Sequence, residues 1–297
     1  MKILLTGARG NFPLALIPRL AASRHELVLF DLEPMDAPEG CISVQADIRD
    51  SAALTHAMQG CEAVIHAAAY HGSAAISRNY EDYYSVNVTG THNVLRAMLL
   101  HGIKYLVFSS TDLVHGDGTR GLRELNEEVS CIPNHMSPLT KYLGEEMCRF
   151  YARKHDFHIA LLRTGCFIPA DWRKAGLGRL NNWLDREDVA QANELALGAV
   201  LAEEFRCEPF LIQCAKPFVD SDWPALATKP ETVLERYWPE STALLAEHGL
   251  QVPLVHTRYD ITKAVTTLGY DPQHNFEQFL ARLRREGAPS PDRSLPF

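Results

Sequence analysis

The turn Thr6-Gly7-Ala8-Arg9-Gly10 near the start of the chain combines residue types that bind phosphate. It follows an apolar run at residues 2–5, typical of a buried parallel strand, and precedes Leu14, Ile17 and Leu20, which share one face of a predicted helix. Glycines let the backbone approach a ligand, and free N–H groups at a helix start face an anion. An ordinary turn is the alternative, but the position after the first strand favours a dinucleotide-binding site.

Asp31 ends the second predicted strand and bears on the choice of cofactor. An acid at this place in a dinucleotide-binding fold hydrogen-bonds the adenosine ribose and repels a 2′-phosphate. Arg9 in the glycine turn acts in the opposite sense, because a basic residue there can pair with that phosphate. We favour NAD, since a carboxylate facing a phosphate is strongly repelled in low dielectric. Alternatively, Asp31 is an ordinary acid at the protein surface. Arg9, for its part, can contact the pyrophosphate or Asp31 instead of a 2′-phosphate.

Short apolar runs alternate with helical patterns along most of the chain. The predicted strands are residues 2–5, 26–31, 42–47, 63–68, 105–110, 159–163 and 210–214, and the longer predicted helices are residues 51–58, 79–100, 138–154 and 186–204. This alternation predicts an α/β Rossmann fold with a doubly wound parallel sheet. We expect an NAD-binding domain from residues 1–165 and 185–216. Residues 166–184 and 217–297, with only short helical patterns, should form a smaller substrate-binding lobe, whose end from Ala288 is expected to fray.

The composition of the 297-residue chain is that of a globular protein, with 46% hydrophobic and 22% charged residues. A net charge of -8 argues against a nucleic-acid partner. We see no apolar stretch long enough to cross a bilayer and no signal-peptide pattern. Seven cysteines lack a C-x-x-C pair or zinc-like spacing, so we expect reduced thiols, no bound metal and a cytoplasmic location.

Further motifs follow in a fixed order along the chain. They are Ala46-Asp47-Ile48-Arg49-Asp50, His66-Ala67-Ala68-Ala69, Asn87-Val88-Thr89-Gly90-Thr91, Phe108-Ser109-Ser110-Thr111, and Thr140-Lys141 with Glu145. Together with the glycine turn and Asp31, they resemble the extended short-chain dehydrogenase/reductase family, which contains NAD-dependent sugar epimerases and dehydratases. The resemblance runs from Met1 to Arg163 and resumes at residues 185–190.

The resemblance implies NAD as the cofactor and assigns residues to it. Asp47 and Ile48 would flank the adenine, and Asn87 would hold the structure near the site unless it faces solvent. The small residues expected below the nicotinamide ribose are Ala67, Ala68 and Ala69. The other expected cofactor contacts are Gly7, Arg9, Gly10, Asn11, Phe12, Asp31, Ser109 and Lys141.

The family's catalytic set is Ser or Thr, Tyr and Lys. The tyrosine, with an ordinary pKa of about 10, needs a nearby cation to exchange protons near neutrality, and a lysine four residues later supplies it. Thr111 falls on the Ser/Thr position and Lys141 on the lysine position, but Ser137 stands where the tyrosine is expected. The flanks fit best if a Tyr-Gly pair is absent between Pro138 and Leu139. Ser137 is predicted instead to cap the helix that starts at Pro138.

Several residues are candidates for the remaining roles. His115 falls near a family tyrosine position and can titrate near neutrality, although a structural histidine is the alternative, and a bound water is another proton carrier. Between Arg163 and Asp188 the chain is shorter than in nucleotide-sugar enzymes of the family and loosely resembles the uronate dehydrogenase branch. The basic residues of this segment, which can meet an anionic substrate or be solvated, are Arg173, Lys174 and Arg179. The predicted substrate contacts are Thr111, Asp112, Tyr70 and Arg173.

These expectations combine into an NAD-dependent oxidoreductase that acts on a small polar sugar or sugar acid and lacks the usual tyrosine. The alternatives are a nucleotide-sugar epimerase or dehydratase, and a non-catalytic NAD-binding sensor. Because helices at the places of residues 79–100 and 138–154 commonly pair in the family, we also expect a homodimer.

Overall fold

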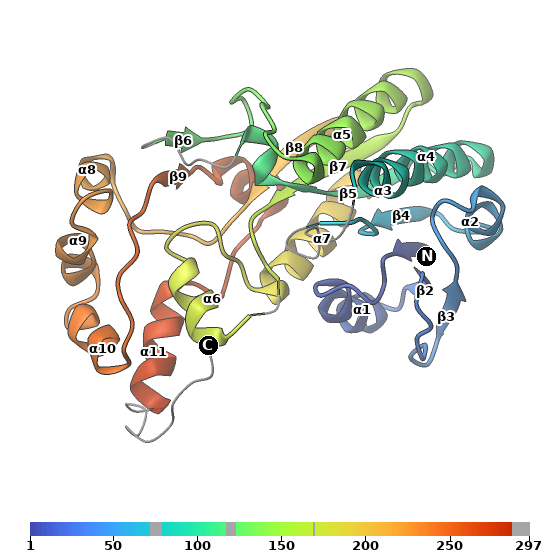
Figure 1. Cartoon of the computed structure of the whole chain (residues 1–297). Coiled ribbons are helices and arrows are strands. Elements are labelled where there is room, and N and C mark those ends of the chain that lie inside the picture. The colour runs from blue at the N-terminus through green and yellow to red at the C-terminus, as the bar shows by residue number, and fades with distance from the viewer. Residues whose placement is uncertain (72–78, 117–122, 169, 287–297) are drawn as a thin grey trace.

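Seven parallel strands form the central sheet, in the order β3-β2-β1-β4-β5-β7-β8 (Figure 1). The structure is a computed structural model and describes residues 1–71, 79–116, 123–168 and 170–286. The strands are β1 Lys2–Thr6, β2 Glu26–Asp31, β3 Cys41–Gln45, β4 Ala63–His66, β5 Tyr105–Thr111, β7 His158–Thr164 and β8 Cys207–Ile212. The order reverses between β1 and β4, which confirms the predicted doubly wound Rossmann fold.

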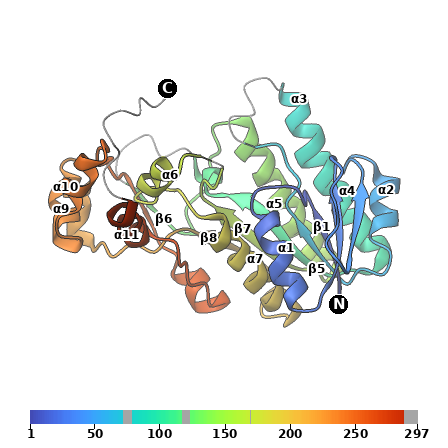
Figure 2. The same ribbon diagram turned by 90° about the horizontal axis from the view of Figure 1, so that it is seen from below.

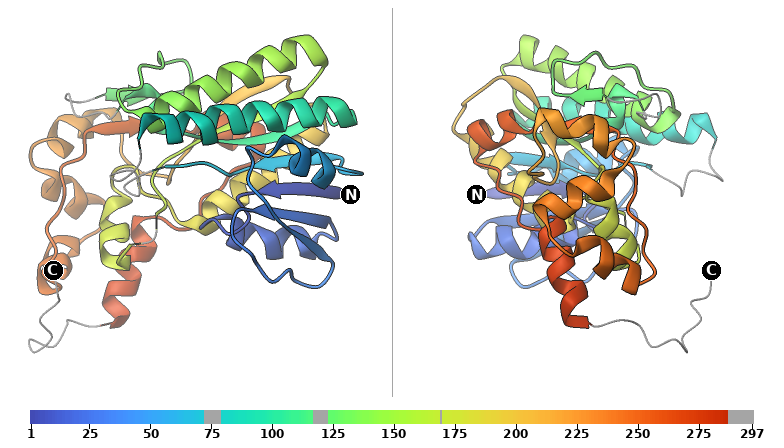
Figure 3. Two further views of the ribbon diagram at one scale, coloured as in Figure 1. Left: turned by 45° about the vertical axis from the view of Figure 1, so that its right-hand side comes forward. Right: turned by 90° about the vertical axis from the view of Figure 1, so that its left-hand side faces the viewer.

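Helices cover both faces of the sheet (Figures 1 and 3). One face packs on α1 Pro13–Ala22 and α7 Arg186–Leu201, and the other on α2 Ser51–Ala57, α4 Gly90–His101 and α5 Met136–His155. Successive strand residues therefore enter opposite cores, which is why the strands are continuous apolar runs. No helix in the described part of the chain is long and apolar enough to cross a bilayer.

Two local predictions about the helices are wrong, and a third, which is confirmed as helical, is more complex than predicted. Leu14 is 50% exposed, because α1 turns Leu16, Ile17 and Leu20 toward the sheet instead. Ser137 is not a cap, since α5 begins at Met136 and Ser137 lies inside its first turn. The helix predicted at residues 79–100 is divided into α3 Tyr80–Tyr83, the π-helix η2 Tyr84–Thr89 and α4.

A second group of elements has its own apolar core beside the sheet (Figure 2). It comprises α6 Trp172–Gly178, η4 Asp220–Asp222, α8 Trp223–Leu226, α9 Pro230–Tyr237, α10 Ser241–Glu247 and α11 Phe276–Glu286. A Cβ atom at Gly176 would lie 2.0 Å from Phe279, so a glycine is required where α6 meets α11. A short parallel sheet of β6 Arg123–Leu125 and β9 Thr257–Tyr259 lies near this group, whereas η5 Ala264–Leu268 packs on α7.

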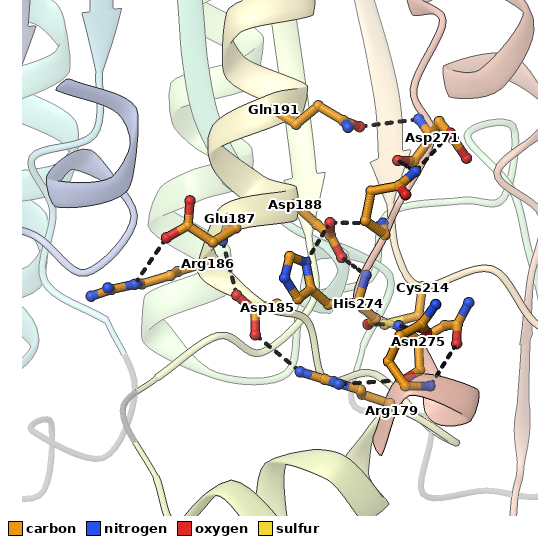
Figure 4. A network of polar contacts seen from close by, with 12 residues as sticks. Arg179, Asp185, Arg186, Glu187, Asp188, Gln191, Cys214, Asp271, His274 and Asn275 are labelled. Atoms are coloured by element: carbon orange, nitrogen blue, oxygen red, sulfur yellow. Dashed lines mark hydrogen bonds and ion pairs between the residues drawn. The ribbon is translucent and has the colours of Figure 1, made fainter. Parts of the chain in front are cut away.

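A polar network joins residues 271–275 to the start of α7 (Figure 4). The buried carboxylate of Asp188 accepts hydrogen bonds from the backbone N–H groups of Gln273 and His274 at 2.9 and 3.0 Å, and contacts the His274 ring at 3.0 Å. The hydrogen bond to Asp188 raises the pKa of His274. The network anchors the chain that leads into α11, and so holds the second core against the sheet.

Candidate active site

A cavity of about 790 Å³ lies at the carboxyl ends of β1, β5 and β7, against the first turn of α5. Its volume is in the range of small-molecule and cofactor sites. Its walls include Gly7, Gly10 to Pro13, Ala67, His71, Ser109 to Leu113, Pro133 to Leu139, Lys141 and Thr164 to Ile168. The structure thus brings the glycine turn together with Ser109, Thr111 and Lys141, which are separated along the sequence.

The glycine turn is shaped by close contact with the end of β4. Gly7 has a φ of +69°, and a Cβ atom there would lie 2.7 Å from the backbone of Ala68, so only glycine fits. The N–H of Gly10 donates to the carbonyl of Gly7 at 2.9 Å. Asn11 donates through its side chain to the carbonyl of Phe167, which ties the turn to the loop after β7. The turn and the start of α1 form a cradle that fits the phosphates of a dinucleotide.

The residues expected around the adenosine lie at the ends of β2 and β3, beyond the cavity walls. The carboxylate of Asp31 accepts the backbone N–H of Arg9 at 2.9 Å and that of Glu33 at 3.0 Å, and is half-buried. Asp47 forms an ion pair with Arg49, whose hydrogen bonds lower the pKa of Asp47. Each oxygen of Asp31 retains acceptor capacity for a ribose hydroxyl.

A buried chain of hydrogen bonds runs beneath the floor of the cavity. Thr6 Oγ1 lies 2.7 Å from His66 Nδ1, His66 Nε2 lies 3.0 Å from Thr91 Oγ1, and Thr91 Oγ1 donates to the carbonyl of Asn87 at 2.5 Å. Since Thr91 donates onward, His66 carries its proton on Nε2 and accepts at Nδ1. Burial lowers the pKa of His66 to about 3, so the ring stays neutral and the donor and acceptor roles in this series of hydrogen bonds do not change.

Asn87 is a connecting residue rather than a wall of the cavity. Its side chain accepts the N–H of Tyr70 at 2.7 Å, donates to the carbonyl of Tyr70 at 2.9 Å, and donates to Thr140 Oγ1 at 2.8 Å. Thr140 Oγ1 in turn donates to the carbonyl of Ser137 at 2.8 Å. Asn87 therefore ties the chain after β4 to the start of α5, in line with the structural role that the family resemblance implies. Tyr70, predicted to contact the substrate, does not itself line the cavity, and its ring packs on the cavity residue Tyr83.

Lys141 and Thr111 both line the cavity. Lys141 Nζ donates to the carbonyl of Ser109 at 2.6 Å and lies 5.1 Å from the centre of the Phe108 ring. Burial lowers the pKa of Lys141 to about 8, so it remains mostly charged at neutral pH. Thr111 Oγ1 accepts the N–H of Leu113 at 3.3 Å and is half-buried at the cavity wall, where a hydroxyl can orient a substrate oxygen.

Asp112 and His115 are both engaged by neighbouring side chains. Asp112 lines the cavity, and its carboxylate accepts hydrogen bonds from the side-chain amide of Gln213 at 3.2 Å and from the hydroxyl of Tyr259 at 3.1 Å. His115 Nε2 accepts a hydrogen bond from Arg163 at 3.2 Å, and its Nδ1 lies 3.4 Å from the carbonyl of Ser130. His115 is not among the residues that line the cavity, so these contacts favour the structural alternative for it.

A buried ion pair lies directly behind the cavity. Glu145 is fully buried and receives two hydrogen bonds from Arg163, at 2.7 and 3.0 Å, one from Arg149 at 2.9 Å and one from Ser110 at 2.6 Å. Burial alone would raise the pKa of Glu145, but the hydrogen bonds and charge of Arg163 outweigh it and keep the pKa low. The pair joins α5 to β5 and β7 at the level of the catalytic positions.

The three basic residues of the segment after β7 have different surroundings. Arg173 packs over the Trp172 ring and lies 4.0 Å from Glu286 of α11, and Arg179 pairs with Asp185 at 2.9 Å and with the carbonyl of Asn275 (Figure 4). None of the three, Lys174 included, lines the cavity. Lys174 is exposed, and its charge lowers the pKa of the cavity residue Cys166 against the larger effect of burial. Of the three, Lys174 is the most exposed, so its charge can meet an anion from solvent, outside the cavity walls.

Sequence reasoning missed several polar residues in the cavity walls. They are His71, Asn134, His135 and Asn182. His71 directly follows the Ala67–Tyr70 stretch, but no spacing links it to Lys141, because the two meet only through the fold.

Comparisons with known proteins agree with this geometry. The family model described as NAD dependent epimerase/dehydratase family matches residues 3–168. Short-chain dehydrogenase/reductase family 42E member 1 of Danio rerio is 36% identical over 46% of this chain, and the match spans 35% of that relative. L-arabinose 1-dehydrogenase (NAD(P)(+)) of Haloferax volcanii is 33% identical over 57% of this chain and 68% of the relative.

Two further similarities extend over nearly the whole chain. The 2-alkyl-3-oxoalkanoate reductase of Stenotrophomonas maltophilia is 33% identical over 97% of this chain and 100% of the relative. Uronate dehydrogenase from Agrobacterium tumefaciens shares the fold, with a TM-score of 0.67 and 23% identity over 98% of this chain and 91% of that one. The family model covers more than half of the 297 residues, so the chain belongs to the NAD dependent epimerase/dehydratase family and is an NAD-dependent enzyme of the extended short-chain dehydrogenase/reductase type.

Proposed function

We propose that this enzyme is an oxidoreductase that transfers a hydride between NAD and a small polar sugar or sugar acid. The observation that carries the proposal is the single cavity shared by the glycine turn, Thr111 and Lys141. The residues fit the cofactor: Gly7 approaches Ala68 too closely for any other residue, and Asp31 lies at the end of β2, where its carboxylate can accept a ribose hydroxyl. The similarity to arabinose and uronate dehydrogenases supports the substrate class.

The roles of the protein groups follow from their positions. When bound, NAD supplies the hydride acceptor or donor. The charged Lys141, fixed by the carbonyl of Ser109, would hold the nicotinamide ribose and favour loss of a proton beside it. Thr111 would hydrogen-bond the substrate oxygen that becomes the carbonyl. Lys174, which is exposed and whose charge acts on the cavity residue Cys166, would attract the carboxylate of a sugar acid from solvent.

A substrate panel tests the proposal. The protein is mixed with NAD and with aldoses, uronates and nucleotide-sugars in turn, and the absorbance of NADH is followed. We expect NADH to form with an aldose or a uronate. Conversion of a UDP-sugar in preference to all of them would favour the epimerase or dehydratase alternative, and NAD binding without turnover of any compound would favour the sensor.

A second candidate function has specific support. The walls of the cavity include several apolar residues: Leu113, Pro133, Met136, Pro138 and Leu139. Such residues suit an alkyl chain, and the similarity to 2-alkyl-3-oxoalkanoate reductase extends over almost the whole chain. The panel therefore includes a long-chain 3-oxo acid with NADH, and faster reduction of this acid than oxidation of any sugar would replace the sugar proposal.

The carboxylate of Asp31 is expected to make the protein prefer NAD to NADP. Its two oxygens are held in place by the N–H groups of Arg9 and Glu33, so the carboxylate cannot rotate away and would repel a 2′-phosphate. Asp31→Asn should weaken NAD binding about tenfold and NADP binding less, because a hydrogen bond to a charged group contributes about 1.5–3 kcal/mol. Calorimetric titration of both cofactors at one salt concentration measures this. Tighter binding of NADP by the unchanged protein would overturn the assignment.

We also propose a homodimer built on α4 and α5. The outer surfaces of these helices carry large exposed apolar residues, Leu99 at 41% and Leu100 at 64% on α4, and Phe150 at 48% on α5. Sedimentation should give a dimer, and Phe150→Glu should shift it toward the monomer, since a charge cannot be buried there without a partner. A monomer at micromolar concentration would contradict the proposal. A cytoplasmic location remains a proposal, supported by seven free cysteines.

A further inference from the structure

His71 lines the cavity that contains Ser137, Thr111 and Lys141, and none of the family motifs accounts for it. The site has a hydroxyl to hold the substrate oxygen and a lysine to supply charge. It lacks the group that exchanges a proton, because a serine stands one helical turn before Lys141. An imidazole is the side chain best suited to that task near neutral pH.

Asn87 links the two chain segments that carry His71 and Lys141. The side chain of Asn87 binds both backbone groups of Tyr70, at 2.7 and 2.9 Å, and donates to Thr140 at 2.8 Å. His71 directly follows Tyr70, and Lys141 directly follows Thr140. One buried amide therefore holds the two chain segments in a constant relation, with both side chains at the same cavity.

The electrostatic environment keeps the His71 ring neutral at pH 7. The ring contacts solvent, but the cavity wall partly desolvates it and lowers its pKa, and the positive charge of Lys141 lowers the pKa further. The other titratable groups in the described walls are Tyr80 and Tyr83 of α3, Asp112 after β5, His135 before α5 and Cys166 after β7. A neutral imidazole in the same cavity as the Lys141 cation can accept a proton from a hydroxyl.

We propose that His71 exchanges the substrate proton in place of the missing tyrosine. The inference rests on the oxidoreductase function proposed above. In alcohol oxidation the C–H bond breaks and its electron pair leaves with the hydrogen as hydride to NAD, while the O–H proton passes to the neutral imidazole and then to solvent. The products are a carbonyl compound, NADH and a proton. In the reverse direction the imidazolium returns the proton to the oxygen.

The kinetic test uses the substrate found in the panel. His71→Ala should lower kcat by about 10²–10⁴-fold, the usual contribution of a positioned acid or base, and leave NAD affinity unchanged. Added imidazole should restore part of the rate, which would not happen if His71 were only structural. His56→Gln is the matched control, since His56 is exposed on α2. A full rate in His71→Ala, or no restoration by imidazole, overturns the proposal.

The pH profile of the unchanged protein is a second kinetic readout. In the oxidation direction the rate should fall as the pH drops through the pKa of His71, which lies below the ordinary 6.5, because the imidazolium cannot accept a proton. It should also fall above a pH of about 8, where Lys141 loses its charge. His71→Ala should lose the acid limb only. An acid limb that survives the substitution overturns the proposal.

A titration followed by NMR needs no turnover. Lys141→Met should raise the pKa of His71 toward 6.5, since it removes the positive charge, whereas Lys141→Arg should leave it low. If no compound in the panel is oxidised, the proposed function fails, but this titration still decides the placement of His71. A His71 pKa that is the same in the Met and Arg variants overturns the inference.

Discussion

Ser137→Tyr is expected to restore turnover to protein that carries His71→Gln, by a factor of about 10² or more. Ser137 lines the cavity and stands in the first turn of α5, four residues before Lys141. Side chains four residues apart lie on the same face of a helix. The phenol would therefore lie near the ammonium group of Lys141, which favours the phenolate. Rates of the single and double variants on the panel substrate measure the effect.

Ser137→Phe in the same background is the matched control, because it adds the ring without the hydroxyl. The restored activity should also move to higher pH, since a phenol has an ordinary pKa of about 10 and an imidazole one of about 6.5. Equal rates with Tyr and Phe would show that the added ring repacks the cavity and carries no proton.

Glu145→Ala is expected to cost about 3–5 kcal/mol of folding free energy, the usual loss when one partner of a buried ion pair is removed. The change leaves Arg163, which is 2% exposed, without its carboxylate, and it removes the acceptor of Ser110. Glu146→Ala is the control: Glu146 is exposed and pairs only at the surface with Arg149, so its loss should cost less than about 1 kcal/mol. Urea unfolding of both variants measures the difference, and equal costs would contradict a dominant role for the buried pair.

The same pair predicts acid sensitivity. The pKa of Glu145 in the folded protein lies below its ordinary value of 4.5, so the folded state holds the charged form more strongly than the unfolded chain does. Its contribution to stability is complete above pH 4.5 and is lost as the pH falls through the folded-state pKa. Unfolding free energies between pH 3 and 6 should therefore fall more steeply for the unchanged protein than for Glu145→Ala.

The fold was predictable because its strands are buried on both faces. Such strands appear as continuous apolar runs, and six of the seven predicted runs begin within one residue of the observed strand; β8 begins three residues earlier than the prediction. The glycine turn was equally visible, since Gly7 is required by a contact that no other residue permits. These features depend on local patterns, which a single sequence contains.

The features that failed depend on contacts between distant segments. Arg173 and Arg179 appeared available to a substrate, but their neighbours Glu286 and Asn275 come about 100 residues later in the chain. The start of α5 was misplaced because a Ser-Pro pair is typical of a helix cap, yet proline is tolerated throughout a first turn. His71 was overlooked because only the fold brings it to the cavity of Lys141.

The number of residues in the π-helix η2 sets the rotation of α3 relative to α4, so the length of this segment matters as much as its composition. Asn87 lies within this wider turn and reaches Tyr70 and Thr140, while the following α4 turns Val94 and Leu95 into the core. A π-turn contains one residue more than an α-turn, and each residue of an α-helix advances the phase by about 100°. Loss of one residue from η2 would therefore rotate α3 and Asn87 relative to α4. A deletion here would disconnect His71 from Lys141 although every side chain of the site remained in the sequence.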